Sequence, residues 1–517
     1  MSDHDVLVVG AGPTGLLAAC ELLRRGVRVR IVDRAHRPAD APKALSLWPR
    51  AQDILEDLGL GEGLRAASVP IRRYGYFSDG RPVASFAIPA EHAAVNLPQY
   101  ETERLLTERL HELGGKVERG VRLSAVDDIR GSIAATDGVS ALLEHADGTV
   151  ERTRTPFLIG ADGAGSTVRE QLGIGFEGST YEMAFALVDA RVEGRLPPDG
   201  ILYYQAPSGT LVIVPLPDGV FRILSVLPGR DRKPGAAMMQ ALLDERGPGG
   251  VRITEPVWET VFTVHARSAT HFRRGRVFLA GDAAHVHSPA GGQGMNNGLQ
   301  DAHNLGWKLA AVIHGHSPDS LLLGYGPERA EATRRIVRDT DLQTRAWMAD
   351  GPLRVRARDA AFRLLERTGA VSRFYAPVMA GRRLAYAPVR ESQSPSLPSG
   401  CRIRGRLPGG LTAGALFPRR LALAYGIAGP ASDPAGWTVA VLPPATGPWT
   451  DRVEHLARQW PQIRVVLLRR GEAAEATGCG RSGYYLIRPD GHIAAHGHAR
   501  DLHRLEAELA VWRGRRQ

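Results

Sequence analysis

Short apolar runs alternate with amphipathic segments through the first part of the chain. Residues 5–9 and 27–32 have the continuous apolar character of buried strands, and residues 14–25 carry their apolar positions on one side of a helix. Gly26 follows this segment, and a glycine commonly ends a helix. The same patterns predict helices at 50–58 and 101–113 and a third apolar strand at 157–159. Strands and helices in alternation indicate a parallel sheet covered by helices.

The pattern changes between residues 180 and 265. The stretch ILYYQAPSGTLVIVPLPDGVFRILSVLP contains three apolar runs separated by the turn signals PSG and PDG, which predicts antiparallel strands. A strand at 277–280 then resumes the first pattern, and helices are predicted at 296–313 and over most of 325–385. Residues 392–400, SQSPSLPSG, have the composition of a linker, and short strands and a helix follow. The chain therefore predicts an α/β fold in which an antiparallel sheet interrupts a parallel one.

Length and composition are those of an ordinary globular protein with two or three domains. At 517 residues the chain is too long for one hydrophobic core. Hydrophobic residues make up 43% and charged residues 23%, a balance that does not indicate disorder. The formal net charge of +10 comes mainly from arginines spread along the chain, and no DNA- or RNA-binding module accompanies them. No nucleic-acid partner is therefore expected, whereas an anionic cofactor suits this charge.

Cysteine usage and the first residues bear on the cellular location. Cys20, Cys401 and Cys479 are too far apart for a metal cluster or a C-x-x-C motif, and this sparse, odd count suits a reducing cytoplasm. The first residues enter an apolar strand without the basic segment of a signal peptide. Because no apolar run approaches the about 18 residues of a membrane span, no membrane partner is expected.

A glycine-rich turn, Gly10-x-Gly12-x-x-Gly15, separates the first strand from the first helix. Here Gly10 permits the tight turn, Gly12 lets a pyrophosphate approach the backbone, and Gly15 allows close packing of helix on strand. The free amides of the helix N-terminus then bind the anion. Asp33 ends the second strand, where a carboxylate accepts hydrogen bonds from a ribose 2′-OH. Together these features predict a dinucleotide site, and they do not distinguish NAD from FAD.

The segment RVFLAGDAAHVHSPAGGQGMNNG supplies what the longer of these cofactors needs. Asp282, at a strand end, can accept hydrogen bonds from ribityl hydroxyl groups. Residues 289–294 have little side-chain bulk, so a flat isoalloxazine ring can lie against their backbone. The helix that begins near Asn296 would direct free N–H groups and a partial positive charge at the ring, which stabilises the negative charge of a reduced flavin. These features favour FAD over NAD.

Three spaced motifs resemble one known family. Residues 275–309, GRVFLAGDAAHVHSPAGGQGMNNGLQDAHNLGWKL, look like the GD motif of the flavin-dependent aromatic hydroxylases, the group similar to p-hydroxybenzoate hydroxylase and the polyketide hydroxylases. FLIGADGAGSTVRE resembles the DG motif of that family through Asp162 and Gly163. YGPERAEATRR, at 325–335, resembles the helix that follows in the family. The resemblance covers residues 1 to about 345.

The resemblance implies a set of residues around FAD. Gln99 stands where the family has a glutamine beside the flavin, and Lys43 stands where it usually has an arginine thought to contact the pyrophosphate. Lysine keeps the positive charge but loses the bidentate fork, so FAD should still bind while its mobility or nicotinamide docking differs. The expected cofactor-binding residues are Gly10, Gly12, Pro13, Thr14, Gly15, Asp33, Arg34, Lys43, Arg50, Gln99, Asp162, Gly163, Asp282, Pro289, Gly291, Gly292, Gly294, Met295 and Asn296. No catalytic residue is assigned, and no metal is expected.

The resemblance also implies a domain organisation. A Rossmann-like FAD-binding domain is expected in two parts, 1–178 and 269–392, the second with a helical extension, and a substrate-binding antiparallel sheet is expected between them at 179–268. GYYLIRPDGHIAAHG resembles the end of the thioredoxin-like domain appended to phenol and polyketide hydroxylases, which predicts such a domain at 400–517. Because neither cysteine in that part belongs to a C-x-x-C motif, we expect it to serve packing or dimerisation.

The activity implied by the resemblance is that of a monooxygenase. NADPH or NADH would dock transiently and reduce FAD, and O2 would form a flavin C4a-hydroperoxide that hydroxylates an electron-rich phenol. The cofactor carries this chemistry, while the protein positions the reactants and excludes water. The inserted sheet, with Tyr203, Tyr204 and Phe221, would cover the aromatic substrate, and alternation predicts that about half of such side chains face elsewhere. The expected substrate is a polyketide or similar phenol of antibiotic biosynthesis, and the expected assembly is a monomer or homodimer.

Other readings stay open at the level of the sequence. The same flavin scaffold performs epoxidation, Baeyer–Villiger oxidation or hydroxylation of an antibiotic such as a rifamycin, and a flavin protein can also act without monooxygenase turnover. His285, His287 and the histidines of 492–498 are potential metal ligands, but no cysteine or acid cluster accompanies them. Without a G-x-S-x-G motif, an α/β-hydrolase is not expected. The arginine-rich stretch 329–390 is expected to be mainly a solvated helix face.

Overall fold

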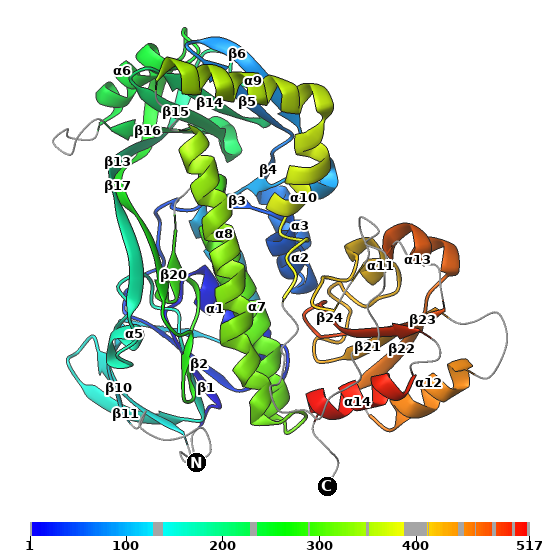
Figure 1. Ribbon diagram of the computed structural model, residues 1–517. Coiled ribbons are helices and arrows are strands. Elements are labelled where there is room, and N and C mark those ends of the chain that lie inside the picture. The colour runs from blue at the N-terminus through cyan, green and yellow to red at the C-terminus, as the bar shows by residue number, and fades with distance from the viewer. Residues whose placement is uncertain are drawn as a thin grey trace.

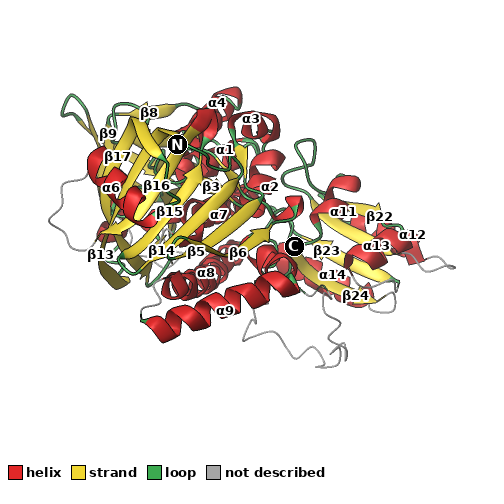
Figure 2. Cartoon of the chain, turned by 90° about the horizontal axis from the view of Figure 1, so that it is seen from above, coloured by secondary structure: helices red, strands yellow, loops and turns green. Residues whose placement is uncertain are grey.

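Two parts of the chain lie side by side, one ending at Tyr386 and the other, here called the C-terminal unit, beginning at residue 411 (Figures 1 and 2). The computed structural model describes residues 3–127, 138–227, 235–287, 290–347, 351–386, 411, 413–442, 449–460, 462–477, 482–498 and 502–513. Pro289, Cys401 and Cys479 therefore lie outside the described residues, as does the predicted linker at 392–400.

A six-stranded sheet forms the base of the first part. Five of its strands run parallel, in the order β19, β12, β1, β2, β8, and a short antiparallel strand, β18, lies at one edge. The bounds are β1 (Val6–Val9), β2 (Val29–Asp33), β8 (Val117–Arg119), β12 (Phe157–Gly160), β18 (Arg273–Arg274) and β19 (Val277–Leu279). Every residue of β1 and β12 is buried, as their continuous apolar sequences predict. The parallel sheet expected from the sequence is thereby confirmed.

Three helices pack around this sheet. They are α1 (Pro13–Leu23), α4 (Gln99–Glu112) and α7 (Gly294–Ile313), each within two residues of its predicted start. Helices α1 and α7 pack closely at Gly306 of α7. A Cβ at this position would lie only 2.8 Å from Glu21 Cβ of α1. Smaller helices and two three-stranded sheets complete this region: α2 (Pro49–Asp57), α3 (Gly61–Ala67), α5 (Thr167–Gln171), β3 (Ser46–Leu47), β4 (Val69–Pro70), β7 (Val95–Asn96), β9 (Val121–Asp127), β10 (Val139–His145) and β11 (Val150–Thr155).

An eight-stranded sheet stands above the parallel one in Figure 1. Its order is β20, β17, β13, β16, β15, β14, β5, β6, and its strands pair antiparallel except for β14 and β5. The bounds are β5 (Arg73–Ser78), β6 (Arg81–Ala87), β13 (Phe176–Glu193), β14 (Gly200–Ala206), β15 (Gly209–Pro215), β16 (Val220–Leu227), β17 (Arg252–Ala269) and β20 (His285–Val286). The predicted antiparallel strands are confirmed. The sheet also takes in β5 and β6, which lie outside the expected insertion, because an alternating pattern does not specify a strand's partner.

The strands β13 and β17 connect the two sheets. Each has 18 residues, and they pair along nearly their whole length. Figure 1 shows them rising from the region of α5 to the eight-stranded sheet, where α6 (Ala236–Arg246) covers the outer face. Their length lets one pair of strands belong to both halves of the molecule.

The stretch 325–385 is largely helical, as predicted. It contains α8 (Tyr325–Trp347), α9 (Pro352–Thr368), a π-helix at Val371–Tyr375 and α10 (Ala376–Met379). Arg329 departs from the expected solvated face, since it is fully buried and pairs with Asp301. Exposed arginines such as Arg334 and Arg335 agree with the expectation and pair with Glu331.

The C-terminal unit is built on a four-stranded sheet with helices around it. The strand order is β22, β21, β23, β24, in which β21 and β22 are parallel and the others antiparallel. The bounds are α11 (Arg419–Ala424), β21 (Trp437–Leu442), α12 (Trp449–Arg458), β22 (Ile463–Leu467), α13 (Arg470–Thr477), β23 (Gly483–Ile487), β24 (Ile493–His498) and α14 (Leu502–Arg513).

A buried ionic network joins this unit to α7 and α8. Arg488, in the turn after β23, bonds to both carboxylate oxygens of Glu328 at 2.7 and 3.0 Å. Lys308 donates to the same carboxylate at 2.7 Å, and Asp490 accepts from the Trp307 indole at 3.0 Å. Burial lowers the pKa of Lys308 to about 8, although the neighbouring Glu328 favours its charged form. The unit is thus attached through paired charges as well as apolar packing.

Among the described residues, no helix is long and apolar enough to cross a membrane. Cys20 lies fully buried in α1, and burial raises the pKa of its thiol to about 12, so this thiol is not a reactive one.

Glu328→Gln should lower the free energy of unfolding by about 3–5 kcal/mol, because it leaves Lys308 buried without a carboxylate and removes one of the two carboxylates that pair with Arg488. Burial alone would raise the pKa of Glu328, but Arg488 and Lys308 outweigh it and hold the pKa at about 2. Between its ordinary 4.5 and about 2, the unfolded chain binds a proton that the folded chain does not. The free energy of unfolding of the wild type should therefore decrease as the pH is lowered from about 4.5 to about 2. The variant should lose less stability over the same range.

Urea denaturation at several pH values measures both effects. Glu331→Gln is the matched control, because its pairs with Arg334 and Arg335 lie on an exposed face of the same helix. An equal loss of stability in the two variants would contradict the importance of the buried network.

Candidate functional site

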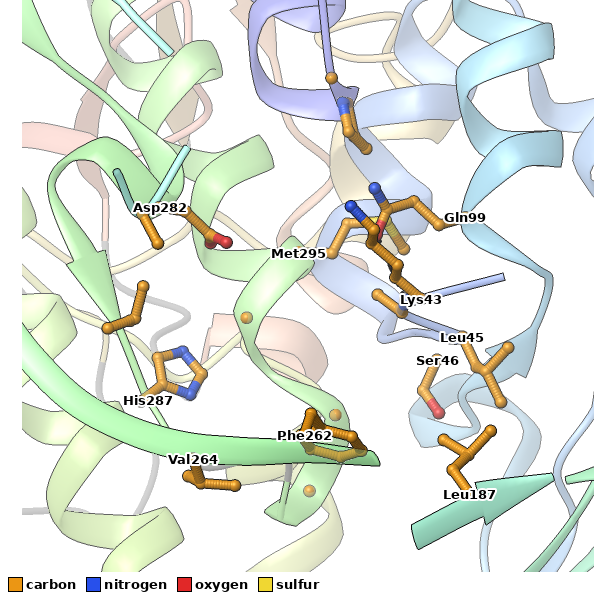
Figure 3. Close-up of a pocket in the computed structure, with 18 of the residues that line it drawn as sticks. Lys43, Leu45, Ser46, Gln99, Leu187, Phe262, Val264, Asp282, His287 and Met295 are labelled. Atoms are coloured by element: carbon orange, nitrogen blue, oxygen red, sulfur yellow. Dashed lines mark hydrogen bonds between the residues drawn. The ribbon is translucent and has the colours of Figure 1, made fainter. Parts of the chain in front are cut away.

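One cavity of about 1320 Å³ extends from the carboxyl ends of the parallel strands to the inner face of the eight-stranded sheet. Typical ligand pockets measure about 300–1,000 Å³, so this cavity has room for more than one ligand. Figure 3 shows part of it: Asp282 lies on one side, Lys43 and Gln99 lie opposite, and Phe262, Val264 and Leu187 are at the far end.

The three glycines of the first turn have different surroundings. A Cβ at Gly10, where φ is +102°, would meet the Ala161 carbonyl oxygen at 2.3 Å, and one at Gly15 would meet the Gly10 carbonyl oxygen at 1.9 Å. At Gly12 a Cβ would meet no described atom within 4 Å, and this residue lines the cavity. Gly10 and Gly15 therefore permit close backbone packing, whereas Gly12 keeps space open beside the N-terminus of α1. This is the cradle that a pyrophosphate requires.

Asp33 closes the same end of the cavity from the tip of β2. Its two carboxylate oxygens accept the Ala11 amide at 2.6 Å and the Ala35 amide at 2.8 Å. A carboxylate offers about four lone-pair sites, so two of them stay open to a ligand on the cavity side. The position fits the ribose of a dinucleotide.

The residues of the DG motif mainly hold the wall of the cavity in place through hydrogen bonds. Asp162 accepts hydrogen bonds from Ser166 Oγ at 2.5 Å and from the Val168 amide at 3.1 Å, and so caps the short helix α5. Burial raises the pKa of Asp162, while these hydrogen bonds favour its charged form. Arg169 joins the motif to the Asp282 turn, since it donates to the Ala164 and Ala283 carbonyls at 2.7 and 2.9 Å.

Asp282 projects into the cavity from a short turn after β19. The turn depends on Gly281, whose φ is +61° and where a Cβ would meet Thr14 Oγ1 at 2.5 Å. The Asp282 side chain is exposed to the cavity, yet protein surrounds it, and this burial raises the pKa of the carboxyl group while His285 and Lys43 oppose the rise. A carboxylate in this place is suited to accept hydrogen bonds from hydroxyl groups.

The glycine loop after this turn presents backbone to the cavity. Gly291 and Gly292 line it with φ of +75° and +59°, and Gly294 and Met295 begin α7 at the same wall. The side chain of Asn296 fixes the loop from behind. Its amide donates to the Ser46 and Gly292 carbonyls at 2.7 Å each, and its oxygen accepts the Trp48 amide at 2.7 Å. The described residues give the N-terminus of α7 no side-chain cap, so its amides are available to a ligand.

The loop that carries Lys43 is held by both halves of the molecule. Gln99 accepts the Ala44 amide at 3.2 Å, and Arg222 of β16 donates to the Lys43 carbonyl at 2.6 Å and to the Pro42 carbonyl. Arg222 is almost fully buried and also pairs with Asp189 at 2.7 Å. The position of Lys43 at the cavity edge is therefore coupled to the eight-stranded sheet.

Aromatic side chains build the far end of the cavity. Tyr76 stacks on Tyr203 with ring centroids 4.9 Å apart, and the ring of Tyr74 lies nearly parallel to Tyr203 at a centroid distance of 6.3 Å. Of the three aromatic residues singled out in the inserted sheet, Tyr203 lines the cavity, whereas Tyr204 and Phe221 belong to a core on the opposite face. The predicted division of alternate side chains between two faces is thus observed.

Most of the residues expected to hold the cofactor do line this one cavity. They are Gly10, Gly12, Pro13, Thr14, Asp33, Arg34, Lys43, Gln99, Asp162, Gly163, Asp282, Gly291, Gly292, Gly294 and Met295. Gly15, Asn296 and Arg50 are not among the lining residues, because Gly15 packs on Gly10, Asn296 fixes the glycine loop, and Arg50 donates to the Asp490 carbonyl of the C-terminal unit at 2.7 Å. We predicted that Arg50 and Asn296 contact the cofactor directly, and their positions outside the cavity lining do not support that prediction.

Several lining residues were not anticipated from the sequence. Arg222 and Trp48 carry no motif, and the helical stretch after residue 350 contributes Phe362, Phe374 and Tyr375. Phe185 and Leu187 are two positions apart in β13, so the sequence places both on one face of a strand. It does not indicate that this face borders a cavity, as the structure shows.

The histidines do not form a metal centre in the described part of the chain, where no group of three or more potential metal ligands occurs. His285 is instead bonded to Asp301 at 2.6 Å, and His492 stacks on Tyr386 with ring centroids 4.2 Å apart.

Comparisons with known proteins agree with the geometry of the cavity. A family model described as an FAD binding domain matches residues 3–340. The 6-methylpretetramide 4-monooxygenase of Streptomyces rimosus is 39% identical in an alignment of 350 positions that covers 66% of this chain and 61% of that protein. The rifampicin monooxygenase of Rhodococcus hoagii is 31% identical in an alignment of 536 positions, gaps included, that covers 99% of this chain and 98% of that protein. The chain therefore spans less than two thirds of the first relative and nearly all of the second.

Solved structures match the whole chain. The OxyS anhydrotetracycline hydroxylase from Streptomyces rimosus superposes with a TM-score of 0.75 and 29% identity, covering 99% of this chain and 100% of its own. CabE, an aromatic hydroxylase from angucycline biosynthesis, superposes with a TM-score of 0.74 and 28% identity, covering 100% of both chains.

Gly12→Val should abolish FAD binding while leaving the protein folded, because the added side chain extends into the open cavity and φ at this residue is an ordinary −74°. The visible spectrum of the purified variant and the Tm of its FAD-free form measure the two effects. Gly326→Val is the control, since a Cβ there also meets no described atom within 4 Å and the residue does not line the cavity. Stoichiometric flavin in the Gly12 variant would contradict the assignment.

Proposed function

The chain belongs to the FAD-binding family that includes the aromatic-compound monooxygenases, and we propose that it uses FAD, NAD(P)H and O2 to hydroxylate an aromatic substrate. The substrate class proposed is a polyketide or other phenol of secondary metabolism. The observation that carries the proposal is the single cavity that joins the Gly12 cradle to the aromatic chamber around Tyr203. A protein that only binds a dinucleotide has no need of the second half of this cavity.

The residues along the cavity fit FAD from one end to the other. The N-terminus of α1 at Gly12 would hold the pyrophosphate and Asp33 the adenosine ribose, while Asp282 would accept hydrogen bonds from the ribityl chain. The backbone of Gly291 and Gly292 offers a flat wall for the isoalloxazine ring. When bound, this cofactor supplies the redox and oxygen-activating chemistry, which side chains alone do not provide.

The protein's own contribution is charge and enclosure. The uncapped N-terminus of α7 lies at the ring wall, where its partial positive charge stabilises an anion. Lys43 adds a full positive charge at the cavity edge. The eight-stranded sheet and the helices after residue 350 close the chamber and keep water from the reacting atoms. NADPH or NADH is proposed as a transient donor, because the sequence has one dinucleotide turn and FAD would occupy it.

The chamber favours a large, flat substrate of low charge. Its walls include the stacked rings of Tyr76 and Tyr203, together with Phe185 and Phe262, which stack at 5.7 Å. Arg222 lies in the same wall but is already bonded to Asp189 and two backbone carbonyls, so it is not available to a substrate carboxylate. A fused-ring phenol suits these surfaces better than a benzoate does.

The strand connectivity supports the domain organisation expected from the sequence. The six-stranded sheet with its glycine turn corresponds to a Rossmann-like FAD-binding domain in two parts, with the substrate sheet inserted between them. In the C-terminal unit, a parallel β–α–β pair is followed by a helix, an antiparallel hairpin and a final helix, which is the connectivity of a thioredoxin-like domain.

A second candidate substrate is a rifamycin-type antibiotic. The similarity to the rifampicin monooxygenase of Rhodococcus hoagii extends over 99% of this chain and 98% of that protein. A macrocyclic naphthohydroquinone also presents an electron-rich phenol to the chamber, so the two candidates share one type of reaction.

The first test is the visible spectrum of the purified protein, followed by NADPH and NADH oxidation with and without a panel of polycyclic phenols and rifampicin. We expect flavin absorption bands, faster oxidation with one class of compound, and a product heavier by one oxygen atom. Flavin without any substrate-stimulated oxidation would favour a redox protein without monooxygenase turnover. Oxygen inserted into a carbon–carbon bond would favour the Baeyer–Villiger reaction.

Leu187→Trp should separate the two halves of the cavity. Leu187 lines the chamber, so the larger ring should fill the place of the substrate and leave the Gly12 cradle intact. We expect unchanged FAD content and at least a tenfold loss of substrate-stimulated NADPH oxidation. Loss of FAD together with activity would show that the chamber and the cofactor site are not separable in this way.

A further inference from the structure

A carboxylate behind the Asp282 turn holds three segments of the chain together. Asp301, in α7, is fully buried, and its Oδ2 accepts the Gly281 amide at 2.9 Å and faces His285 Nε2 at 2.6 Å. Its other oxygen accepts Arg329 Nε at 2.6 Å. Burial alone would raise the pKa of Asp301, but His285 and Arg329 outweigh it and lower that pKa, so the group is ionised. Charge-assisted hydrogen bonds of this kind are short and strong.

The Gly281 amide is the point at which this carboxylate acts on the cavity. Gly281 immediately precedes Asp282 and has a left-handed φ of +61°. A hydrogen bond to its amide fixes the plane of the peptide that enters the turn, and so restrains the backbone one residue before Asp282. Asp301 therefore orients a cavity residue without lining the cavity itself.

Arg329 extends the arrangement away from the cavity. It is fully buried in α8 and donates to Asn297 Oδ1 at 2.5 Å as well as to Asp301. Its remaining terminal nitrogen donates to the Tyr386 hydroxyl at 3.1 Å. The guanidinium group is thus held at both ends, and its planar fork leaves little freedom to rotate.

Tyr386, the last described residue of the first part, packs against the C-terminal unit. Its ring stacks on His492 with centroids 4.2 Å apart and an angle of 28° between the planes, and its amide donates to the Gly414 carbonyl at 3.0 Å. Arg488 lies over the same ring at 5.4 Å. A continuous series of direct contacts therefore runs from the C-terminal unit through Tyr386, Arg329 and Asp301 to Gly281.

We propose that Asp301 is a positioning residue for the flavin site, and that the C-terminal unit fixes its position through Tyr386 and Arg329. Asp301 holds the turn that aims Asp282 at the ribityl chain, and the C-terminal unit thereby contributes to flavin affinity from outside the cavity. The inference rests on the proposed function in one respect, the assignment of Asp282 to the ribityl chain.

The test compares two ligands of the same cavity, FAD and ADP-ribose. ADP-ribose fills the cradle at Gly12 and Asp33 but lacks the ribityl chain and the ring. Tyr386→Phe removes only the hydroxyl that Arg329 contacts and keeps the ring against His492. We expect it to weaken FAD about threefold, and Asp301→Asn to weaken FAD at least tenfold, with the affinity for ADP-ribose unchanged in both. Calorimetric titration of the FAD-free proteins gives the dissociation constants.

Two controls separate positioning from loss of structure. Tyr425→Phe deletes a half-buried tyrosine hydroxyl of the C-terminal unit that bonds to Glu472 at 2.7 Å instead of to Arg329, and it should leave both affinities unchanged. The Tm of each FAD-free variant shows that it is folded at the temperature of the titration. Should Asp301→Asn not fold, the comparison of Tyr386→Phe with Tyr425→Phe still decides the proposal.

The outcomes are distinct for the inference and for the proposed function. If Tyr386→Phe binds FAD as wild type does, or loses FAD and ADP-ribose affinity in equal measure, the positioning role is wrong. Asp282→Ala is the reference for the function itself, because unchanged FAD affinity in that variant would overturn the ribityl assignment. Weaker FAD binding in Asp282→Ala but not in the Tyr386 and Asp301 variants would overturn the inference alone.

Discussion

The carboxyl ends of parallel strands in one sheet meet at one edge, and this constraint assembles the site. Strands β1, β2, β12 and β19 end there, and each has one of the cavity residues Gly10, Asp33, Asp162 and Asp282 at its last residue or within three residues after it. The strands must also pack closely enough for the Gly10 turn to approach Ala161, which a Cβ at Gly10 would prevent. Residues far apart in the sequence thus become the walls of one cavity because of strand order, and the side chains supply only the final chemistry.

The second half of the cavity depends on the long pair β13 and β17. Because these two strands carry the chain from the parallel sheet to the eight-stranded sheet, the aromatic chamber lies directly over the cofactor side. Arg222 strengthens this relation, since it reaches from β16 to the backbone of the Lys43 loop. Movement of the eight-stranded sheet and movement of the Lys43 loop are therefore mechanically coupled. The same geometry explains how one fold can serve different substrates in different proteins, because the residues of the chamber can change while the glycine cradle stays constant.

Local sequence patterns predict the parts of this structure that depend on local physics. The apolar runs of β1 and β12, the glycines of the first turn and the acid that ends β19 were all recognisable, because burial, positive φ and helix-end amides leave signatures within a few residues. Pairing between distant segments leaves no such signature. The entry of β5 and β6 into the eight-stranded sheet, the contact of Arg50 with Asp490 and the burial of Arg329 follow only from tertiary packing.

The buried ionic network between α7, α8 and the C-terminal unit bears on how such a protein can evolve. Glu328 pairs with the guanidinium of Arg488, and the Trp307 indole donates to the carboxylate of Asp490, so separation of the two parts would cost both of them buried polar partners. An appended domain attached by apolar contact alone can be exchanged or lost with modest cost. One attached in this way changes only together with its host, and a recombination breakpoint in the preceding linker would join charges that no longer match. We therefore expect the C-terminal unit and the first part of the chain to be inherited together.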